Sequence, residues 1–420
     1  MRAAQRSLRR SLVWCSLEGM TAAVVAACSG GAVLTAWALH LGASPLMLGT
    51  LWGLPYLAQV AQPVAAWLTT LAGAKRVAVW ATTIGRQMLW GLALLPLSAS
   101  MSARQRLLLA CFGVFAVMGV VGNNAWTSWV AVLVPARVRG RYFGPRSARA
   151  MLVGTVASLA IGAYVDRASA RGDAAHALVV TCAAGAAFGL LSTFLMLQQH
   201  SVPASAPLDR RALLAPLKDA RARRVLTFQM AWSASTGIAA SFYGAQALGA
   251  LGLGVTGLAA YNTALALVRA AATPSWGQAL DRAGLRPVLA ACASLSACGS
   301  ALWIWAAPGR LWLIGVDTIV SGVALSGMDL AVFMLPMAVE VGVAMPAFVA
   351  ASSMIAGVTF GAASIAGGAL AGALPAAAPS LTIRALFALS ALGRAIAAGL
   401  AARIVGADRA TAAPDGSPLG

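Results

Sequence analysis

Acidic residues are scarce in this chain: Asp and Glu together number eleven among 420 residues, and all charged residues make up only 10%. Soluble domains usually carry about 25% charged residues. The sequence therefore lacks the polar side chains that would cover a water-soluble globule of this length, while hydrophobic residues make up 60% of it. This composition predicts a polytopic membrane protein.

Histidine and cysteine are also few, and their spacing matches no known type of site. The six cysteines all fall inside apolar segments without a CxxC pair, and the three histidines lie near segment ends. Zinc sites and catalytic groups need such residues at short, regular spacings. We therefore expect no metal, no cofactor, no enzymatic activity and no disulfide bonds.

Long apolar runs dominate the rest. A helix of about 20 residues crosses about 30 Å of hydrocarbon, and twelve segments approach this length. The first follows Arg10 and ends near Leu41, and the others run roughly over Pro45–Leu71, Val77–Leu97, Leu107–Val134, Ala148–Val165, Ala175–Leu197, Val225–Leu248, Val255–Leu280, Leu285–Ala306, Leu311–Leu335, Met345–Leu374 and Thr382–Val405. The sequence predicts an all-α membrane protein with twelve transmembrane helices.

The polar and basic stretch His200–Arg224 divides the predicted spans into six and six. We expect residues 1–199 and 225–406 to form two six-helix bundles, joined by a cytoplasmic linker over 200–224 and followed by a tail over 407–420. The net charge of +19 could indicate nucleic-acid binding, but the basic residues lie in short loops instead of on one soluble face. We therefore expect a lipid bilayer as the surroundings, and no nucleic acid as a partner.

The distribution of basic residues predicts the orientation. With the N-terminus inside, 21 of the 30 Lys and Arg residues fall in inner segments and six in outer loops, as the excess of positive charge in cytoplasmic loops requires. Both termini are therefore expected in the cytoplasm, and the protein in the cell (inner) membrane. The inner connection Pro336–Pro346 departs from this pattern, since it carries only Glu340.

One motif lies at the inner end of the eighth span, where Trp276–Val288 reads WGQALDRAGLRPV. A glycine allows a tight reversal, an acid can accept from a helix N-terminus, and arginines anchor at headgroups. This stretch resembles the signature G-x-L-A-D-R-x-G-R-K/R of the major facilitator superfamily. The matching residues are Gly277, Leu280, Asp281, Arg282, Gly284 and Arg286.

Two other loops resemble the same family. LTTLAGAKRV is a weaker first copy of the signature, which keeps Gly73, Lys75 and Arg76 but lacks the acid. In the loop after the fourth span, Arg139, Gly140 and Arg141 belong to a stretch similar to the family's P-x-x-x-R-G-R-x-x-G. The resemblance implies two pseudo-symmetric six-helix bundles, a gating role for these loops, and a monomer that moves a small molecule by alternating access.

Charged residues inside spans need a reason, because each costs roughly 2.5 to 3.5 kcal/mol near the bilayer centre. The family resemblance implies that helices 1, 4, 7 and 10, supported by 2, 5, 8 and 11, line a central cavity. The substrate-cavity candidates are therefore Glu18, Asn123, Asn124, Trp126, Thr127, Asn262, Arg269, Asp317 and Asp329. Arg86 and Arg394, on helices 3 and 12, are expected to be structural. By depth, Arg269 can pair with either Asp317 or Asp329.

These residues favour a secondary transporter that couples a small-molecule substrate to protons. An acid that is not held by Arg269 would carry the proton. The alternative is a relative that keeps the fold but does not transport, such as a membrane sensor or an assembly partner. The incomplete first signature favours this alternative. Transport is favoured by a polar stripe on the eighth span, where Asn262, Thr273 and Trp276 share the helical face of Arg269, and by Asp317 and Asp329 on the tenth span.

Overall fold

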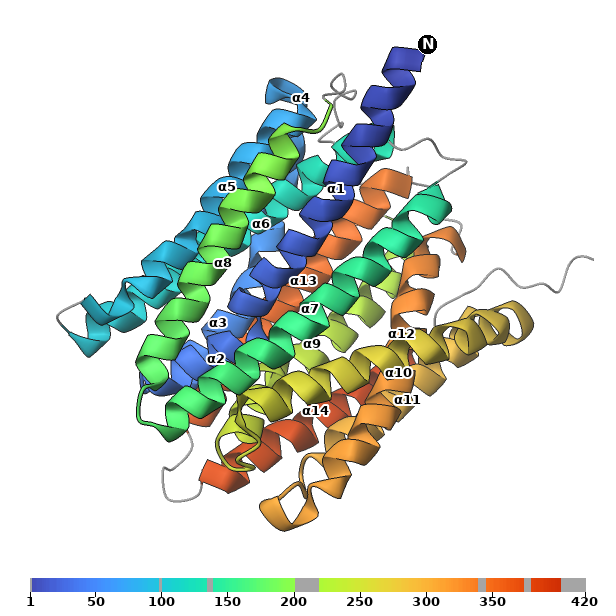
Figure 1. Cartoon of the computed structure of the whole chain (residues 1–420). Coiled ribbons are helices and arrows are strands. Elements are labelled where there is room, and N and C mark those ends of the chain that lie inside the picture. Colours follow the sequence, from blue (N-terminus) through green and yellow to red (C-terminus); the bar gives the residue numbers. More distant parts are fainter. Residues whose placement is uncertain are drawn as a thin grey trace, which may run out of the picture.

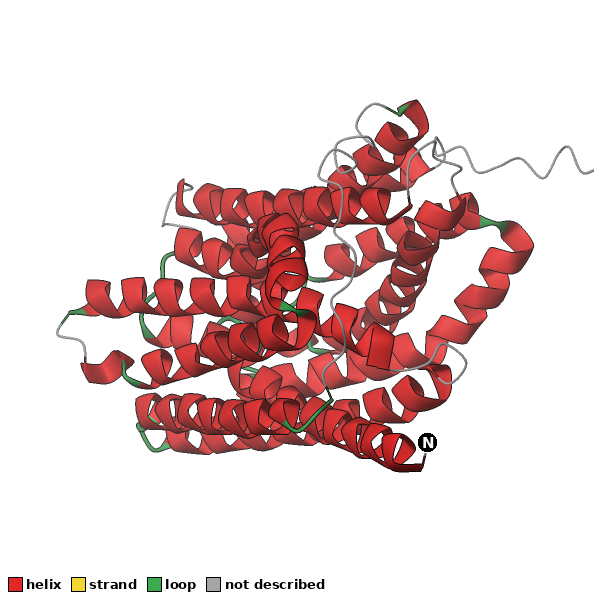
Figure 2. Cartoon of the chain, turned by 90° about the horizontal axis from the view of Figure 1, so that it is seen from above, coloured by secondary structure: helices red, strands yellow, loops and turns green. Residues whose placement is uncertain are grey.

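A computed structural model describes residues 2–97, 100–133, 139–200, 219–338, 345–373 and 379–401. Within these residues every regular element is a helix, and no strand occurs (Figures 1 and 2). The expected all-α class is therefore confirmed. Of the expected linker (200–224), residues 201–218 lie outside the described residues, and α9 already begins at Ala220. The expected tail (407–420) also lies outside the described residues.

The helices form two bundles (Figure 1). The first contains α1 (Arg2–Ser29), α2 (Gly31–His40), α3 (Pro45–Leu57), η1 (Ala58–Ala61), α4 (Gln62–Ala72), α5 (Ala74–Ala93), η2 (Leu95–Leu97), α6 (Met101–Leu133), α7 (Arg139–Ala170) and α8 (Ala174–Leu197). The second contains α9 (Ala220–Leu248), α10 (Gly254–Ala283), α11 (Leu285–Leu302), η5 (Pro308–Arg310), α12 (Trp312–Ala338), α13 (Met345–Ala373) and α14 (Pro379–Ala401).

Two of the predicted spans are broken helices. The first is interrupted at Gly30, between α1 and α2, where the Ser29 hydroxyl donates to the carbonyl of Val25 at 2.8 Å. The second passes from α3 through η1 to α4, and prolines at positions 55 and 63 flank this break. Proline removes a backbone donor and disrupts the helix before it. The remaining predicted spans correspond to single long helices, several of which extend past the predicted apolar run.

The same glycine turn ends the second and the eighth span. Gly73 lies between α4 and α5 with a φ of 87°, and Gly284 lies between α10 and α11 with a φ of 84°. A left-handed φ is accessible to glycine with little strain, so each helix can reverse over one residue. The turn expected at Gly284 is confirmed, and its counterpart at Gly73 reflects the pseudo-symmetry of the two bundles.

Eight helical segments of the described residues are long and apolar enough to cross a membrane, and the first of them joins α1 and α2. Their spans are Arg10–His40, Met101–Val130, Pro145–Ala170, Ala174–Leu197, Leu285–Leu302, Trp312–Leu335, Ala351–Ala373 and Leu381–Ala401. The helices outside this set are α3 and α4, which are short, and α5, α9 and α10, which are less apolar. Both α9 and α10 contribute polar residues to a cavity, which accounts for their lower hydropathy.

Apolar clusters fill both bundles and continue across the boundary between them, where two helix pairs make most of the contacts. Helix α3 packs against α13, and α7 packs against α10. At the first crossing the backbones approach closely: a Cβ at Gly53 would lie 2.9 Å from the carbonyl oxygen of Gly361. Small residues allow such contacts between membrane helices.

Candidate functional site

A cavity of about 670 Å³ lies between the two bundles. The first bundle contributes residues of α3, η1 and α4, and the second contributes residues of α9, α10, α12, α13 and α14. Aromatic residues form much of the wall: Trp52, Tyr56, Trp232, Tyr243, Tyr261 and Phe360. The rings of Tyr56 and Phe360 stack across the bundles with their centroids 3.7 Å apart. A cavity of this size and composition suits a small organic molecule.

The cavity runs from an exposed end to a buried end along α12. Asp329 and Asp317 both line it, twelve residues or about 18 Å apart along the helix. The side chain of Asp329 is 60% exposed, whereas Asp317 is only 1% exposed. We use the name N-terminal face for the end of the molecule at which α1 begins (Figure 1). Because α12 ends toward this face, the cavity opens toward it.

Asp317 is held by neutral donors. Its Oδ2 accepts from the Tyr261 hydroxyl at 2.7 Å and from the Trp303 indole N–H at 2.8 Å, and its Oδ1 accepts from the Ser321 hydroxyl at 2.5 Å. Among the described residues, no cation lies within ion-pair distance of this carboxylate. A buried charge is costly when it lacks an opposite charge. All the hydrogen-bond partners of this buried carboxylate in the described part of the chain are neutral.

Asp329 has a different environment, because the Arg269 guanidinium donates to its Oδ2. The side chain of Arg269 is 39% exposed, so water screens this pair partly. The sequence allowed Arg269 to pair with either aspartate of α12, and the structure selects Asp329. Asp317 is thereby left without the arginine.

Two donors in the cavity wall have no acceptor among the described residues. Arg394 is 7% exposed; one of its terminal nitrogens donates to the backbone and side-chain oxygens of Ser296, and the other donates to the Tyr243 hydroxyl at 3.3 Å. Its Nε–H is buried and makes no hydrogen bond. The indole N–H of Trp52, on the facing bundle, is likewise buried and unpaired. Leaving a buried donor unpaired costs about 1 to 3 kcal/mol.

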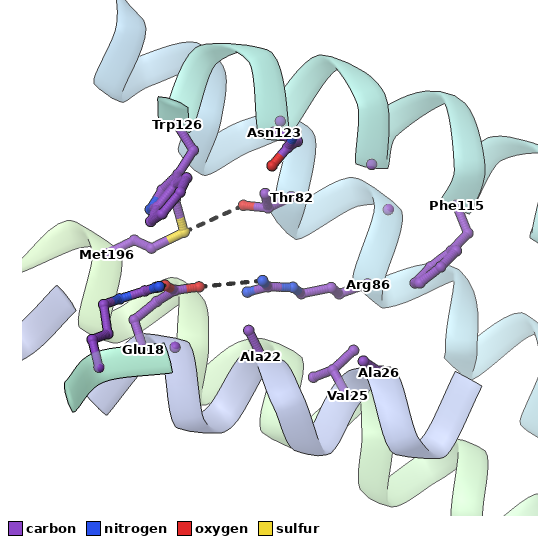
Figure 3. Close-up of a pocket in the computed structure, with 15 residues that line it drawn as sticks. Glu18, Ala22, Val25, Ala26, Thr82, Arg86, Phe115, Asn123, Trp126 and Met196 are labelled. Carbon is purple, nitrogen blue, oxygen red and sulfur yellow. Dashed lines mark hydrogen bonds and ion pairs between the residues drawn. The ribbon is translucent and has the colours of Figure 1, made fainter. Parts of the chain in front are cut away.

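A second cavity, of about 390 Å³, lies inside the first bundle between α1, α5, α6, α7 and α8 (Figure 3). Glu18, which is 4% exposed, points toward Arg86 and accepts from it at 3.2 Å (Figure 3). Its second oxygen accepts from Arg146 at 3.3 Å, and the Ser192 hydroxyl donates to the first at 3.1 Å. The guanidinium of Arg146 also lies 4.8 Å from the ring centroid of Trp126. Arg86 thus pairs with one of the cavity candidates and itself lines this cavity, and its structural role stays a prediction.

The four cavity candidates of the fourth span do not all line the same cavity: two line the cavity of the first bundle, and two make hydrogen bonds to other helical residues. Asn123 and Trp126 line the cavity inside the first bundle. The Asn124 amide donates to Gln62 at 2.8 Å and so links α6 to α4. Thr127 bonds the carbonyl of Asn123 in its own helix at 2.7 Å. On α10, Asn262 lines the cavity between the bundles and also a third cavity, of about 480 Å³, among small residues of α1, α2, α7 and α10.

The first signature loop lies at the N-terminal face. At the start of α5, before the predicted span from Val77, Lys75 donates to the carbonyl of Leu197 at 2.9 Å and to that of Gln199. Its ammonium also lies 5.9 Å from the ring centroid of Trp129. Burial lowers the pKa of Lys75 from its usual value. Lys75 therefore ties the loop to the end of α8, whereas the adjacent Arg76 makes no such contact in the described part of the chain.

For the remaining residues of the loop motifs, the structure gives the helix in which each lies but few side-chain contacts. Arg139, Gly140 and Arg141 belong to the first turn of α7, but their side chains lie outside the described residues. Gly277, Asp281 and Arg282 lie in the last turns of α10, and Arg286 begins α11. Their proposed gating role stays a prediction.

The sequence did not reveal Arg394 and the aromatic residues of α9 and α10 as cavity residues. Arg394 belongs to α14, the last span, which was expected to be peripheral. The only signal in the sequence is the cost of placing an arginine inside an apolar helix. Trp52 gives no signal at all, because a tryptophan in a membrane helix is ordinary.

The fold with these cavities is similar to solved structures of membrane transporters. The nucleoside transporter NupG shares 14% identity over 94% of this chain and 98% of its own, with a TM-score of 0.71. PepTSo2, which was crystallised as a tetramer, shares 14% identity over 95% of this chain and 98% of its own, with a TM-score of 0.70. A bacterial homologue of the human lysosomal transporter Spinster, inward-facing and unoccupied, shares 15% identity over 95% of this chain and 97% of its own, with a TM-score of 0.68.

Neither a protein-family model nor a curated protein matches the sequence. The solved structures define the fold, which is that of the major facilitator superfamily transporters. Together with the apolar helices, this fold makes the chain an integral membrane protein. The fold expected from the loop motifs is confirmed.

Proposed function

We propose that the chain is a proton-coupled secondary transporter that moves a small molecule by alternating access, with Asp317 as the proton-carrying residue. The observation that carries this proposal is the difference between three buried or cavity acids. Glu18 and Asp329 each lie within ion-pair distance of an arginine, whereas only hydroxyl and indole groups donate to Asp317.

The surroundings of Asp317 suit both protonation states. The hydroxyls of Tyr261 and Ser321 can donate to a carboxylate and, after rotation, can accept from a carboxyl group. The Trp303 indole can only donate, and so keeps one oxygen as an acceptor in both states. Asp317 can therefore bind and release a proton without losing its hydrogen bonds.

The contacts between the bundles support alternating access. At the end opposite the N-terminal face, the Asp166 carboxylate of α7 accepts from the backbone N–H groups of Val255 and Thr256, both at 2.8 Å. These groups begin α10, so the acid caps a helix of the other bundle. The cavity opens at the N-terminal face instead. The arrangement fits a state that is closed at one end and open at the other.

The solved transporters suggest which compounds to test first. In a suitable assay, purified protein in liposomes that contain a pH-sensitive dye receives a panel of nucleosides, short peptides and small organic acids. A substrate should produce proton influx under an inward proton gradient. Asp317→Asn should abolish this influx yet leave downhill exchange of the substrate, because the variant cannot carry the proton.

Asp173→Asn is a matched control, since Asp173 is exposed and makes no side-chain cap bond; it should behave as the wild type. Gradient-driven accumulation by Asp317→Asn at the wild-type level would contradict the assignment of the proton. Absence of flux for every compound, with intact folding, would instead support the non-transporting alternative.

A further inference from the structure

We infer that the substrate is an aromatic monocarboxylate, and that its carboxylate binds at Arg394. This inference rests on the proposed transport function and assigns it a class of substrate. Two observations carry it. Arg394 lies in the cavity wall without an ion-pair partner among the described residues. The N–H groups of Arg394 Nε and Trp52 Nε1 are buried and have no hydrogen-bond acceptor there. Both concern the cavity between the bundles.

The hydrogen bonds of Arg394 do not use all of its donors. Nη1 donates to both oxygens of Ser296 and Nη2 donates to the Tyr243 hydroxyl, whereas the N–H of Nε makes no hydrogen bond in the described part of the chain. In a guanidinium, Nε and one of the terminal nitrogens present their N–H groups on the same edge. Such a pair fits the two oxygens of a carboxylate in a bidentate contact.

The charge of Arg394 is also unpaired. No described carboxylate lies within ion-pair distance of it, although Arg394 is nine-tenths buried. The ring centroid of Trp232 lies 6.0 Å from its guanidinium carbon. A buried arginine without an anion is costly, and an anionic ligand would remove this cost.

The facing wall supplies a further donor and the apolar surface. The indole N–H of Trp52 is buried and unpaired, and a tryptophan N–H can only donate. Tyr56 of the same bundle also lines the cavity, and its ring stacks on that of Phe360 of α13. A ligand with acceptor oxygens and a flat apolar body would therefore contact both bundles.

Two acids in the same wall restrict the charge of the ligand. Asp317 and Asp329 line the cavity together with Arg394, so a dianion such as a phosphate monoester would meet two like charges. A monoanion better matches Arg394, the cation without an acid partner among the described lining residues. The groups that face Asp317 are Tyr261 of α10, Trp303 beyond α11 and Ser321 of its own helix, all neutral. Neutralising Asp317 should therefore strengthen binding of the anion.

The test uses the full-length protein in detergent, without a gradient. The probes are phenylacetate, 3-phenylpropionate and indole-3-acetate, each compared with its neutral amide by calorimetry. Wild type should bind at least one acid about tenfold or more tightly than its amide, since hydrogen bonds to a charged group are the strong ones. Arg394→Lys keeps the charge but loses the paired donors, and should remove most of this preference.

Arg384→Gln is the control on the same helix, because Arg384 is exposed and lines no described cavity; it should retain the preference. Trp52→Phe, which removes the N–H donor of the facing bundle but keeps an aromatic ring, should weaken the acid severalfold and leave the amide unchanged. Asp317→Asn should bind the acid more tightly than wild type. These two variants test the site even if changes at Arg394 prevent folding.

Equal binding of acids and amides, or no binding of any acid to wild type, would overturn the inference. So would wild-type preference in both Arg394→Lys and Trp52→Phe. Because binding is measured without transport, the two proposals can fail separately. Acid binding without any flux would contradict transport alone, whereas proton flux driven only by neutral compounds would contradict the carboxylate site alone.

Discussion

Replacing Glu18 by Gln tests whether the charge cluster of the first bundle is structural. Glu18 accepts from Arg86 at 3.2 Å, from Arg146 at 3.3 Å and from Ser192 at 3.1 Å, and its side chain is 5% exposed. The two arginine side chains are only 15% and 13% exposed. In the Glu18→Gln variant, two buried cations would share a site without an anion.

The expected loss is large because water cannot replace the carboxylate there. Removing one partner of a buried ion pair costs about 3 to 5 kcal/mol. Some of this loss is offset, since Arg146 also donates to the carbonyl of Cys15 at 3.1 Å and lies over Trp126. We therefore expect Glu18→Gln to destabilise the protein by about 3 kcal/mol, the lower end of that range.

Unfolding in mixed micelles, followed by tryptophan fluorescence, measures this loss. The loss of stability in the double variant Glu18→Gln, Arg146→Gln should be smaller than the sum of the two single losses, by more than about 1 kcal/mol. The reason is that Arg146→Gln removes one of the two cations that Glu18→Gln leaves without an anion. Asp173→Asn controls for the loss of an exposed acid. Strict additivity, or a loss below about 1 kcal/mol, would refute the reasoning. If Glu18→Gln instead lost proton flux at unchanged stability, Glu18 would carry the proton.

Three other predictions concern orientation, a turn and the closed end. A cysteine at Ser205, on a cysteine-free background, should react with an impermeant maleimide only after the cells are opened, because the basic linker is expected in the cytoplasm. Labelling of this cysteine in intact cells would overturn the predicted topology. Gly284→Ala should destabilise the protein by about 1 to 2 kcal/mol, because its φ of 84° is strained for residues with a side chain. Gly277→Ala should be tolerated, because a Cβ added there would meet no neighbouring atom within 4 Å. Equal stability of the two variants would be inconsistent with that explanation. Asp166→Ala removes the cap on α10, which is worth about 1 to 2 kcal/mol. Spin labels on α7 and α10 should then report a larger population in which the two helices are separated. Unchanged label distances would show that the cap does not hold the bundles together.

The fold was predictable because its signals are local. Twelve apolar runs near the length of a membrane span require helices, since every backbone polar group must be satisfied within the lipid. The turn at Gly284 depends on one residue and was also predictable. The break between α3 and α4 was not predicted, although Pro55 and Pro63 lie next to it.

The candidate site was predictable only in part, because its contacts join distant segments. The depth of Arg269 allowed two partners, and only the packing of α10 against α12 selects Asp329. The pairing of Glu18 with Arg86 and Arg146 depends on three helices whose rotation no local pattern determines. Depth along a helix can be counted from the sequence, but the direction of a side chain around it depends on its neighbours.

The crossing of α3 and α13 has a mechanical consequence. Gly49 and Gly53 of α3 meet Ser364 and Gly361 of α13 backbone to backbone, and the Ser364 hydroxyl donates to the Gly49 carbonyl at 2.9 Å. Glycine has no rotamers to rearrange. The side-chain contacts that a turn of one helix on the other would change include the Ser364 hydrogen bond and the stack of Tyr56 on Phe360. If the bundles rock as proposed, this crossing would serve as the pivot, and release of the Asp166 cap at the far end of the α7–α10 pair would limit the rate.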